Sequence, residues 1–173
     1  DRDTVHNATF HQKFLEEINQ GNPQIIVGTQ MIAKGLHLPN VTLVGVILAD
    51  LGLYLPDFRA SERSFQLLCQ VIGRAGRGLT PGHAIIQTYS PQNYAIRAAA
   101  QQNYEMFYHQ EMNTRESLVY PPFSRLARLI FQHSNEEYTR MIVHRHRKLI
   151  EKAKATLGVN EVTIIGPIPA YPP

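Results

Sequence analysis

The sequence predicts an α/β protein whose first part is a parallel sheet covered by helices. Short apolar runs alternate with amphipathic segments of helical periodicity from residue 6 to residue 89. The apolar runs are almost continuous, as in parallel strands buried on both faces. The pattern changes at the YPP triplet, residues 120–122, which a helix cannot cross. We therefore expect a second domain, of α+β type, after this point.

The first predicted domain covers residues 1–118 and repeats the order helix, strand, helix, strand. Glycine and proline separate its segments. In the helix before the basic turn, Phe65, Leu68, Cys69 and Ile72 share one face and are expected in the core. The expected elements are a helix over 6–20, strands over 24–28 and 41–49, a helix over 60–75, a strand over 83–89 and a helical extension over 92–117.

The second predicted domain covers residues 119–173. It should hold a strand over 125–132, a helix over 135–157 that Gly158 ends, and a strand over 162–166. One β-α-β unit is too small to close a core, so we expect the truncated start of a larger domain with an uncovered strand edge that could pair with another copy. The chain begins without methionine and ends in GPIPAYPP, which also indicates a piece of a longer protein.

Composition excludes some classes of site and partner. The net charge of +3 favours anionic partners without proving that they are nucleic acids. The single cysteine, Cys69, excludes a disulfide within the chain and a cysteine-cluster zinc site, and its apolar surroundings predict a core residue. We predict no metal site. No apolar run is long enough to span a membrane.

The segment GTQMIAKG, residues 28–35, follows a predicted strand. Gly28 permits a sharp turn, and Thr29 with the following N–H groups could bind an oxyanion at a helix start. Taken by itself, this segment is better explained by an ordinary strand-to-helix turn. The order of residues differs from a Walker A loop.

The segment QVIGRAGRG, residues 70–78, places two arginines among three glycines. Gln70, Arg74 and Arg77 lie near one face of the predicted helix. The planar guanidinium group matches phosphate geometry and stabilises charge on a transferring phosphoryl group. The alternative is a basic helix end that favours the helix dipole.

Together, GTQMIAKGLHLPNVTLV and QLLCQVIGRAGRG resemble motifs V and VI of superfamily-two helicases. The segments PDFRASER and YPPFSRLARL, with the opening DRDT, more closely resemble the primosomal replication-restart DNA helicases, the PriA family. The resemblance covers essentially the whole chain. It implies a RecA-like, P-loop NTPase-like second helicase lobe followed by the start of the C-terminal domain.

The resemblance also implies roles for single residues. Arg77 would be the arginine finger, with Arg74 as a second phosphate contact. His37 stands where many relatives carry aspartate. Because histidine cannot act as a carboxylate acceptor, its role stays open between a nucleotide contact and a plain turn residue. The remaining implied residues are Gln70, Gly73 and Gly35 on the ATP side, and Thr29, Gln30 and Lys34 at the DNA.

The activity implied is ATP-dependent 3′-to-5′ movement on DNA, with restart of stalled replication forks and assembly of the primosome. ATP and magnesium would be shared with a first lobe absent from this chain, which should be inactive alone, and zinc would be bound elsewhere in the full-length protein. Implied partners are forked or single-stranded DNA, primosome proteins and single-strand-binding protein in the bacterial cytoplasm, at the nucleoid. Two alternatives stay open: a non-catalytic nucleic-acid-binding or partner-docking module, and a lobe of another superfamily-two repair helicase.

Two charged regions carry further expectations. Arg59 and Glu62 are three residues apart and should form an ion pair, with a DNA or lobe-coupling role for Arg59 as the alternative. The helix 135–157 is basic, and its charges indicate either a solvated face or a surface for the DNA backbone. The cations concerned are Arg140, Arg145, Arg147, Lys148, Lys152 and Lys154.

Overall fold

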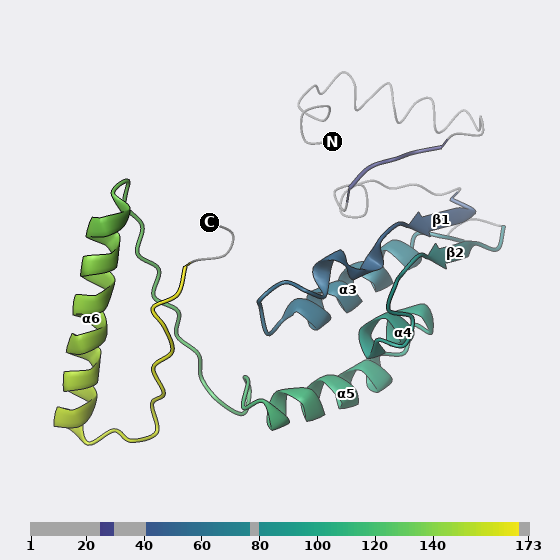
Figure 1. The fold of residues 1–173 in the computed structure, drawn as a ribbon. Coiled ribbons are helices and arrows are strands. Elements are labelled where there is room, and N and C mark those ends of the chain that lie inside the picture. The colour runs from purple at the N-terminus through teal and green to yellow at the C-terminus, as the bar shows by residue number, and fades with distance from the viewer. Residues whose placement is uncertain (1–24, 30–40, 77–79, 170–173) are drawn as a thin grey trace. The chain divides into compact units, whose positions relative to one another are not determined.

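Helix α3 (Ala60–Ile72) connects two parallel strands and lies against one face of them. The computed structural model describes residues 25–29, 41–76 and 80–169 (Figure 1). The chain divides into two units, residues 1–124 and 125–173. Each unit is described by itself.

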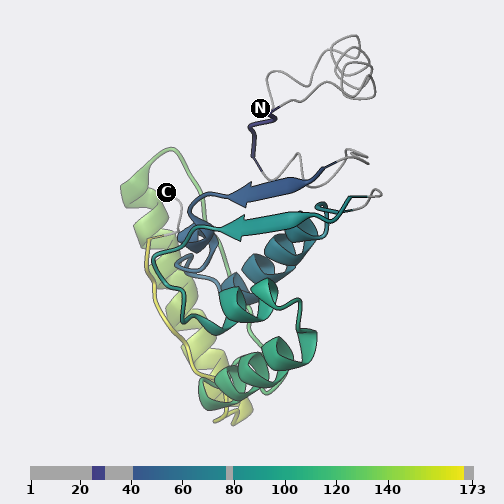
Figure 2. The same cartoon turned by 90° about the vertical axis from the view of Figure 1, so that its right-hand side faces the viewer.

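The described sheet consists of β1 (Leu43–Val46) and β2 (His83–Ile86), paired in parallel with Leu43 opposite His83. Figure 2 shows the two strands side by side with α3 packed against them. Val46 and Ile86 contact the core on this face. The predicted α/β character and parallel pairing are confirmed for these two strands.

Both strands are shorter than the predicted 41–49 and 83–89. Leu48 adopts a left-handed conformation with φ of 55°, and the 3-10 helix η1 (Ala49–Gly52) follows. The buried carboxylate of Asp50 then accepts hydrogen bonds from the Thr88 hydroxyl at 2.8 Å and the Tyr89 N–H at 3.0 Å. Backbone bonds from Gln87 N–H to the Val46 carbonyl at 2.8 Å and from Ala49 N–H to the Gln87 carbonyl at 3.0 Å continue just past the strands, and the Asp50 side chain then joins the two segments.

The electrostatics of Asp50 agree with this role. Burial raises the pKa of its carboxyl, but the hydrogen bonds from Tyr89 and Thr88 outweigh burial, and the pKa lies below its ordinary value. Asp50 is therefore a charged group whose buried position is balanced by donors.

The core of the first unit lies between α3, α4 (Tyr94–Ala100) and α5 (Tyr104–Ser117). The rings of Phe65 and Phe107 stack with centroids 4.1 Å apart. Cys69 packs against this core, as predicted, and burial raises the pKa of its thiol. The buried apolar residues are Phe65, Leu68, Ile72, Ala95, Ile96, Ala98, Ala99 and Phe107.

The predicted helical region 92–117 is two helices. Asn93 and Asn103 cap them, accepting hydrogen bonds from the N–H groups of Ala95 and Met106 at 2.9 Å each. Gln102 between them has a positive φ of 49°. The second asparagine starts a new helix at an angle and so lets both helices pack on α3.

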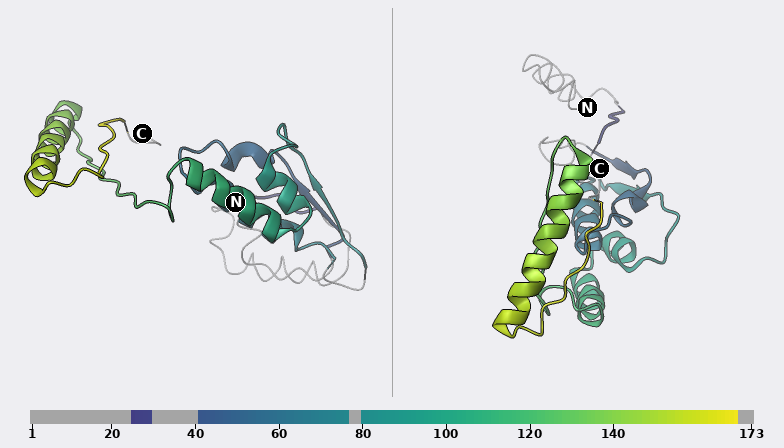
Figure 3. Two further views of the ribbon diagram at one scale, coloured as in Figure 1. Left: turned by 90° about the horizontal axis from the view of Figure 1, so that it is seen from below. Right: turned by 60° about the vertical axis from the view of Figure 1, so that its left-hand side comes forward.

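The second unit contains α6 (Glu136–Leu157), which begins at the cap Asn135 and ends at Gly158 in a left-handed conformation, as predicted. Extended segments precede and follow it (Figure 3). Lys154 Nζ donates to the Val162 carbonyl at 2.5 Å, and the Phe131 and His146 rings lie 4.8 Å apart, so both segments contact the helix. None of the described helices is long and apolar enough to cross a membrane.

Three predicted strands are wrong where the structure describes them. Residues 25–28 of the predicted strand 24–28, and the predicted strands 125–132 and 162–166, are extended but are not assigned to any sheet. Apolar periodicity alone cannot make a strand, because a strand also needs a partner for its backbone hydrogen bonds. The predicted helix 6–20 and residue 24 lie outside the described residues.

Candidate functional site

The candidate site begins where α3 ends, at the QVIGRAGRG segment. The helix stops at Ile72, three residues before the predicted end at residue 75. A tight turn follows, in which the N–H groups of Arg74 and Ala75 bond the carbonyls of Val71 and Ile72 at 3.0 Å each. The change from helix to turn moves Arg74 off the helical face that the sequence predicted for it.

The glycines of the turn approach the chain's own backbone. Gly76 has a φ of +74°, and its N–H donates to the Val41 carbonyl at 2.9 Å. A Cβ atom on Gly82 would lie 2.1 Å from the Gly76 nitrogen. Val41 precedes β1 and Gly82 precedes β2. These contacts therefore attach the end of α3 to the segments that lead into the amino ends of the two strands.

Two predicted site residues lie at this end of the helix. Gln70 is exposed, on the side of α3 opposite Leu68, while Arg74 is half-buried. Arg74 is therefore partly covered by the rest of the first unit, whereas Gln70 is open to water. An amide and a guanidinium group supply hydrogen-bond donors, which fit a polyphosphate anion.

The other predicted site residues fall mostly outside the described part of the chain. Thr29 is described and exposed, and Gly73 is the residue that ends α3. The structure does not bring Thr29 together with Gln70 or Arg74 in any described contact. The predicted residues outside the described ranges are Gln30, Lys34, Gly35, His37 and Arg77.

The PDFRASER segment forms the start of α3. The Asp57 carboxylate accepts the Arg59 N–H at 2.9 Å and pairs with Arg63 at 2.8 Å. Arg59 and Glu62 form the predicted ion pair at 3.4 Å. Charged side chains therefore organise the first turn of the helix.

Arg115 on α5 is the residue that sequence reasoning missed. Its Nη2 donates to Glu62 at 2.8 Å, its Nε to Glu111 at 2.7 Å and its Nη1 to the Pro121 carbonyl at 3.3 Å. The guanidinium carbon also lies 5.3 Å from the centre of the Phe58 ring. One side chain thus joins the start of α3, α5 and the YPP segment.

The two carboxylates that bind Arg115 also accept hydrogen bonds from other side chains. Glu111 is buried, and its second oxygen accepts the Tyr94 hydroxyl at 2.6 Å. Burial and then Glu111 raise the pKa of Tyr94 to about 12. Burial raises the pKa of Glu62, but hydrogen bonds from Arg115 and Arg59 bring it below its ordinary value. The spacing of Glu111 and Arg115 was the available sequence signal, and it pointed only to a local pair.

Several of the cationic side chains of α6 form ion pairs or hydrogen bonds within the second unit. Arg140 pairs with Glu136 at 2.7 Å, and Arg147 pairs with Glu151 at 2.8 Å. Arg147 also bonds the Gly166 carbonyl. Arg140 therefore fits the solvated-face interpretation, whereas Arg147 and Lys154 hold the segment that follows the helix. Arg145, Lys148 and Lys152 are exposed.

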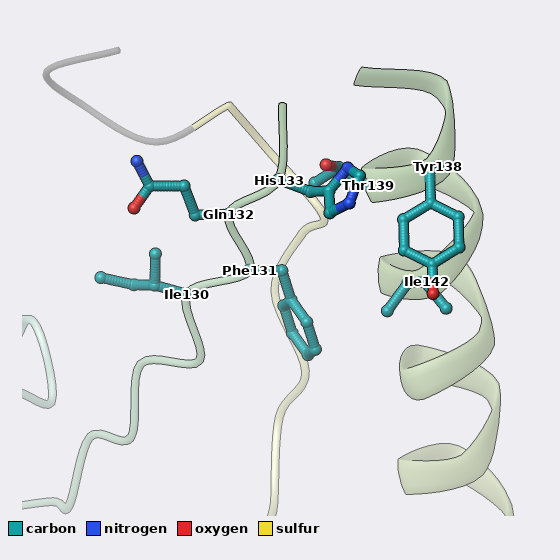
Figure 4. Close-up of a pocket in the computed structure, with 7 residues that line it drawn as sticks. All are labelled: Ile130, Phe131, Gln132, His133, Tyr138, Thr139 and Ile142. Atoms are coloured by element: carbon teal, nitrogen blue, oxygen red, sulfur yellow. The ribbon is translucent and has the colours of Figure 1, made fainter. Parts of the chain in front are cut away.

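A hollow of about 270 Å³ lies beside the start of α6 (Figure 4). The His133 ring contacts the Tyr138 ring, and its Nδ1 accepts the Asn135 N–H at 3.0 Å. These polar groups shape the beginning of the helix. The lining residues are Ile130, Phe131, Gln132, His133, Tyr138, Thr139 and Ile142. The residues that the structure describes contain no group of three metal-ligating side chains.

Comparison with known proteins bears on the whole chain. Residues 7–78, which include both glycine-containing motifs, match the family described as helicase conserved C-terminal domain. The chain is 47% identical over 167 residues to the replication restart protein PriA of Bacillus subtilis, which covers 96% of the chain. The chain belongs to the PriA family. The PriA proteins of Chlamydia muridarum and Synechocystis are 45% and 42% identical over 88% and 98% of it.

The matched region is a limited part of these relatives. The chain spans about a fifth of the length of each of the three PriA proteins. The similarity extends past residue 118, so the YPP segment and α6 belong to the PriA sequence as well as the motif-bearing part.

Proposed function

We propose that this chain is the second helicase lobe, with the start of the following domain, of an ATP-dependent 3′-to-5′ DNA helicase that restarts stalled replication forks. The observation that carries the proposal is the helicase family match over residues 7–78 within PriA similarity over nearly the whole chain. Identities of 42–47% to PriA proteins favour this function over a repair helicase of another type. In the proposed protein, residues 1–118 form the lobe and residues 119–173 begin the next domain.

The end of α3 supplies the proposed ATP contacts. In this proposal Arg77 is the arginine finger and Arg74 contacts a second phosphate group. Gln70, Gly73 and Gly35 are the other residues assigned to the ATP. Guanidinium groups placed against the γ-phosphate stabilise the charge that develops as the phosphoryl group transfers. The exposed Gln70 amide and the Arg74 guanidinium are donors of the kind that a nucleotide needs. Magnesium neutralises phosphate charge when bound, and its ligands belong to the first lobe.

The proposed DNA contacts are Thr29, Gln30 and Lys34. Thr29 is exposed and follows Gly28, so its hydroxyl and N–H group are accessible to a phosphate. The proposed partners of the whole protein are forked or single-stranded DNA, primosome proteins and single-strand-binding protein, in the cytoplasm at the nucleoid. Zinc belongs to another part of the whole protein.

The test is Arg77→Ala in a protein that joins this chain to a first helicase lobe. We expect DNA-stimulated ATP hydrolysis to fall by about 10³-fold, because an arginine finger acts on the transition state. DNA binding should stay within about twofold, since this side chain faces the nucleotide. The 173-residue chain alone should hydrolyse no ATP, because it holds half of the site.

Arg140→Ala is the matched control, since it removes a cation from an exposed pair on α6. It should leave ATP hydrolysis unchanged. Retained hydrolysis in Arg77→Ala would contradict the arginine-finger role, and hydrolysis by the isolated chain would contradict the shared site.

A further inference from the structure

We propose that Arg115 is a positioning residue for the ATP site: it anchors the first turn of α3 and, through this helix, sets the position of the turn that carries Arg74. This inference rests on the proposed function for its effect on ATP hydrolysis. Its structural part concerns only described residues of the first unit.

The anchor is specific to a planar, forked cation. Three nitrogens of Arg115 reach three different segments, at Glu62, Glu111 and Pro121, and only 13% of its side chain is exposed. Lysine could place one ammonium group among these acceptors but could not meet them in three directions. The site therefore depends on the shape of the guanidinium group as well as on its charge.

The YPP segment is fixed by the same residue. Besides the Pro121 carbonyl contact, the Tyr120 N–H donates to the Arg115 carbonyl at 2.8 Å. The Tyr120 ring lies 5.8 Å from the ring of Phe58, which precedes α3. A shift of residues 120–122 would thus move side chains that contact the start of α3.

Helix α3 can carry such a shift to its other end. Glu62 lies one turn before Phe65, whose ring stacks on Phe107 and forms the nearest core contact. At 1.5 Å per residue, Glu62 is roughly 4.5 Å and Ile72, the last helical residue, roughly 10.5 Å along the helix axis from Phe65. A tilt about this contact would therefore move the end of α3 that carries the turn roughly twice as far as the Glu62 end.

Other contacts also hold this end of α3. Leu68 and Ile72 face a core to which α4 contributes alanines. The Gly76 N–H bonds the Val41 carbonyl at 2.9 Å. The anchor at Glu62 is needed because misplacing a catalytic group by about 1 Å costs about 10²-fold in rate.

The first measurement is amide hydrogen exchange on the full 173-residue chain, comparing wild type with Arg115→Lys and Glu62→Gln. We expect about tenfold faster exchange in residues 70–76 in both variants, in addition to faster exchange around residues 57–63. The control variants Arg140→Lys and Glu136→Gln alter the exposed pair of α6 and should leave residues 70–76 unchanged. Faster exchange confined to residues 57–63 and 115–122 would show a local structural role and overturn the proposal.

The second measurement is DNA-stimulated ATP hydrolysis in a protein that includes a first lobe. Arg115→Lys should lower kcat about tenfold and leave the KM for ATP within twofold, because positioning acts on the transition state. Combining it with Glu62→Gln should cost little more than the worse single change, since both act through one contact. Unchanged kcat in an active protein would overturn the proposal. Absence of ATP hydrolysis in the wild-type protein would instead refute the proposed function, and the exchange result would still decide the role of Arg115.

Discussion

Glu111–Arg115 on α5 and Glu136–Arg140 on α6 are ion pairs with the same spacing and the same 2.7 Å separation. The side chains of the first pair are 7% and 13% exposed, and those of the second are 79% and 74% exposed. The first pair also bonds Glu62 and Tyr94, which come from other helices. The same spacing in the sequence thus produces a buried pair that links several helices in one unit and an exposed pair within one helix in the other.

The apolar side chains of the two units differ in the same way. Phe65 and Phe107 lose nearly all their surface to water in the first unit. Helix α6 contains no buried residue, although apolar side chains such as Leu149 recur along it. An amphipathic pattern states which face a helix can bury, and the packing of other elements decides whether it does.

The largest expected effect is that of Phe65→Ala. Removing a ring that is 6% exposed and stacked at 4.1 Å should lower the free energy of unfolding by about 3–5 kcal/mol. Leu149→Ala, at a residue 53% exposed on α6, should cost about 0.5 kcal/mol or less. Urea unfolding followed by circular dichroism measures both values. Similar losses at the two positions would remove the contrast between the units.

An intermediate effect is expected for Glu111→Gln. Without this charge, Arg115 loses its shortest partner in a half-buried place, so the free energy of unfolding should fall by about 2 kcal/mol or more. The matched change Glu136→Gln, in an exposed pair, should cost about 0.5 kcal/mol or less. Equal costs in urea unfolding would mean that burial adds nothing to the first pair.

The smallest effect concerns alkaline pH. Tyr94 has a pKa of about 12 in the folded chain against 10.0 ordinarily, so its hydroxyl keeps a proton that the unfolded chain loses first. Stability from this group is therefore complete below pH 10 and declines as the pH rises toward 12. Tyr94→Phe should remove this part of the decline, as measured by urea unfolding between pH 9 and 11.5. An identical decline in the variant would show that other groups cause it.

Local features of the chain were predictable because their causes are local. The capping asparagine and glycine bounded α6, and apolar spacing located α3 and its core residues Phe65 and Leu68. The Arg59–Glu62 pair followed from a separation of three residues. The glycine and arginine pattern of residues 70–78 indicated a helicase, and the helicase family match over residues 7–78 includes this segment.

The errors arose where distant segments decide the outcome. Residues 125–132 have the composition of a strand, yet they are extended outside any sheet, since among the described residues no strand pairs with them. The 60–75 helix ended early because Gly76 is held by Val41, which is 35 positions away in the sequence. No local pattern contains either contact.

The sequence by itself determined the α6 helix and its ends, the position of α3, the parallel pair β1 and β2, and the family. Only the tertiary structure decided that Arg115 meets Glu62 across 53 positions and that the Gly76 and Gly82 backbones touch. The physical reason is that helix caps and periodicity act within a few residues, whereas burial and ion pairing between segments depend on how whole helices pack. The sequence therefore determines which chemical groups the Arg74 turn carries. Contacts at both ends of α3 determine where that turn lies.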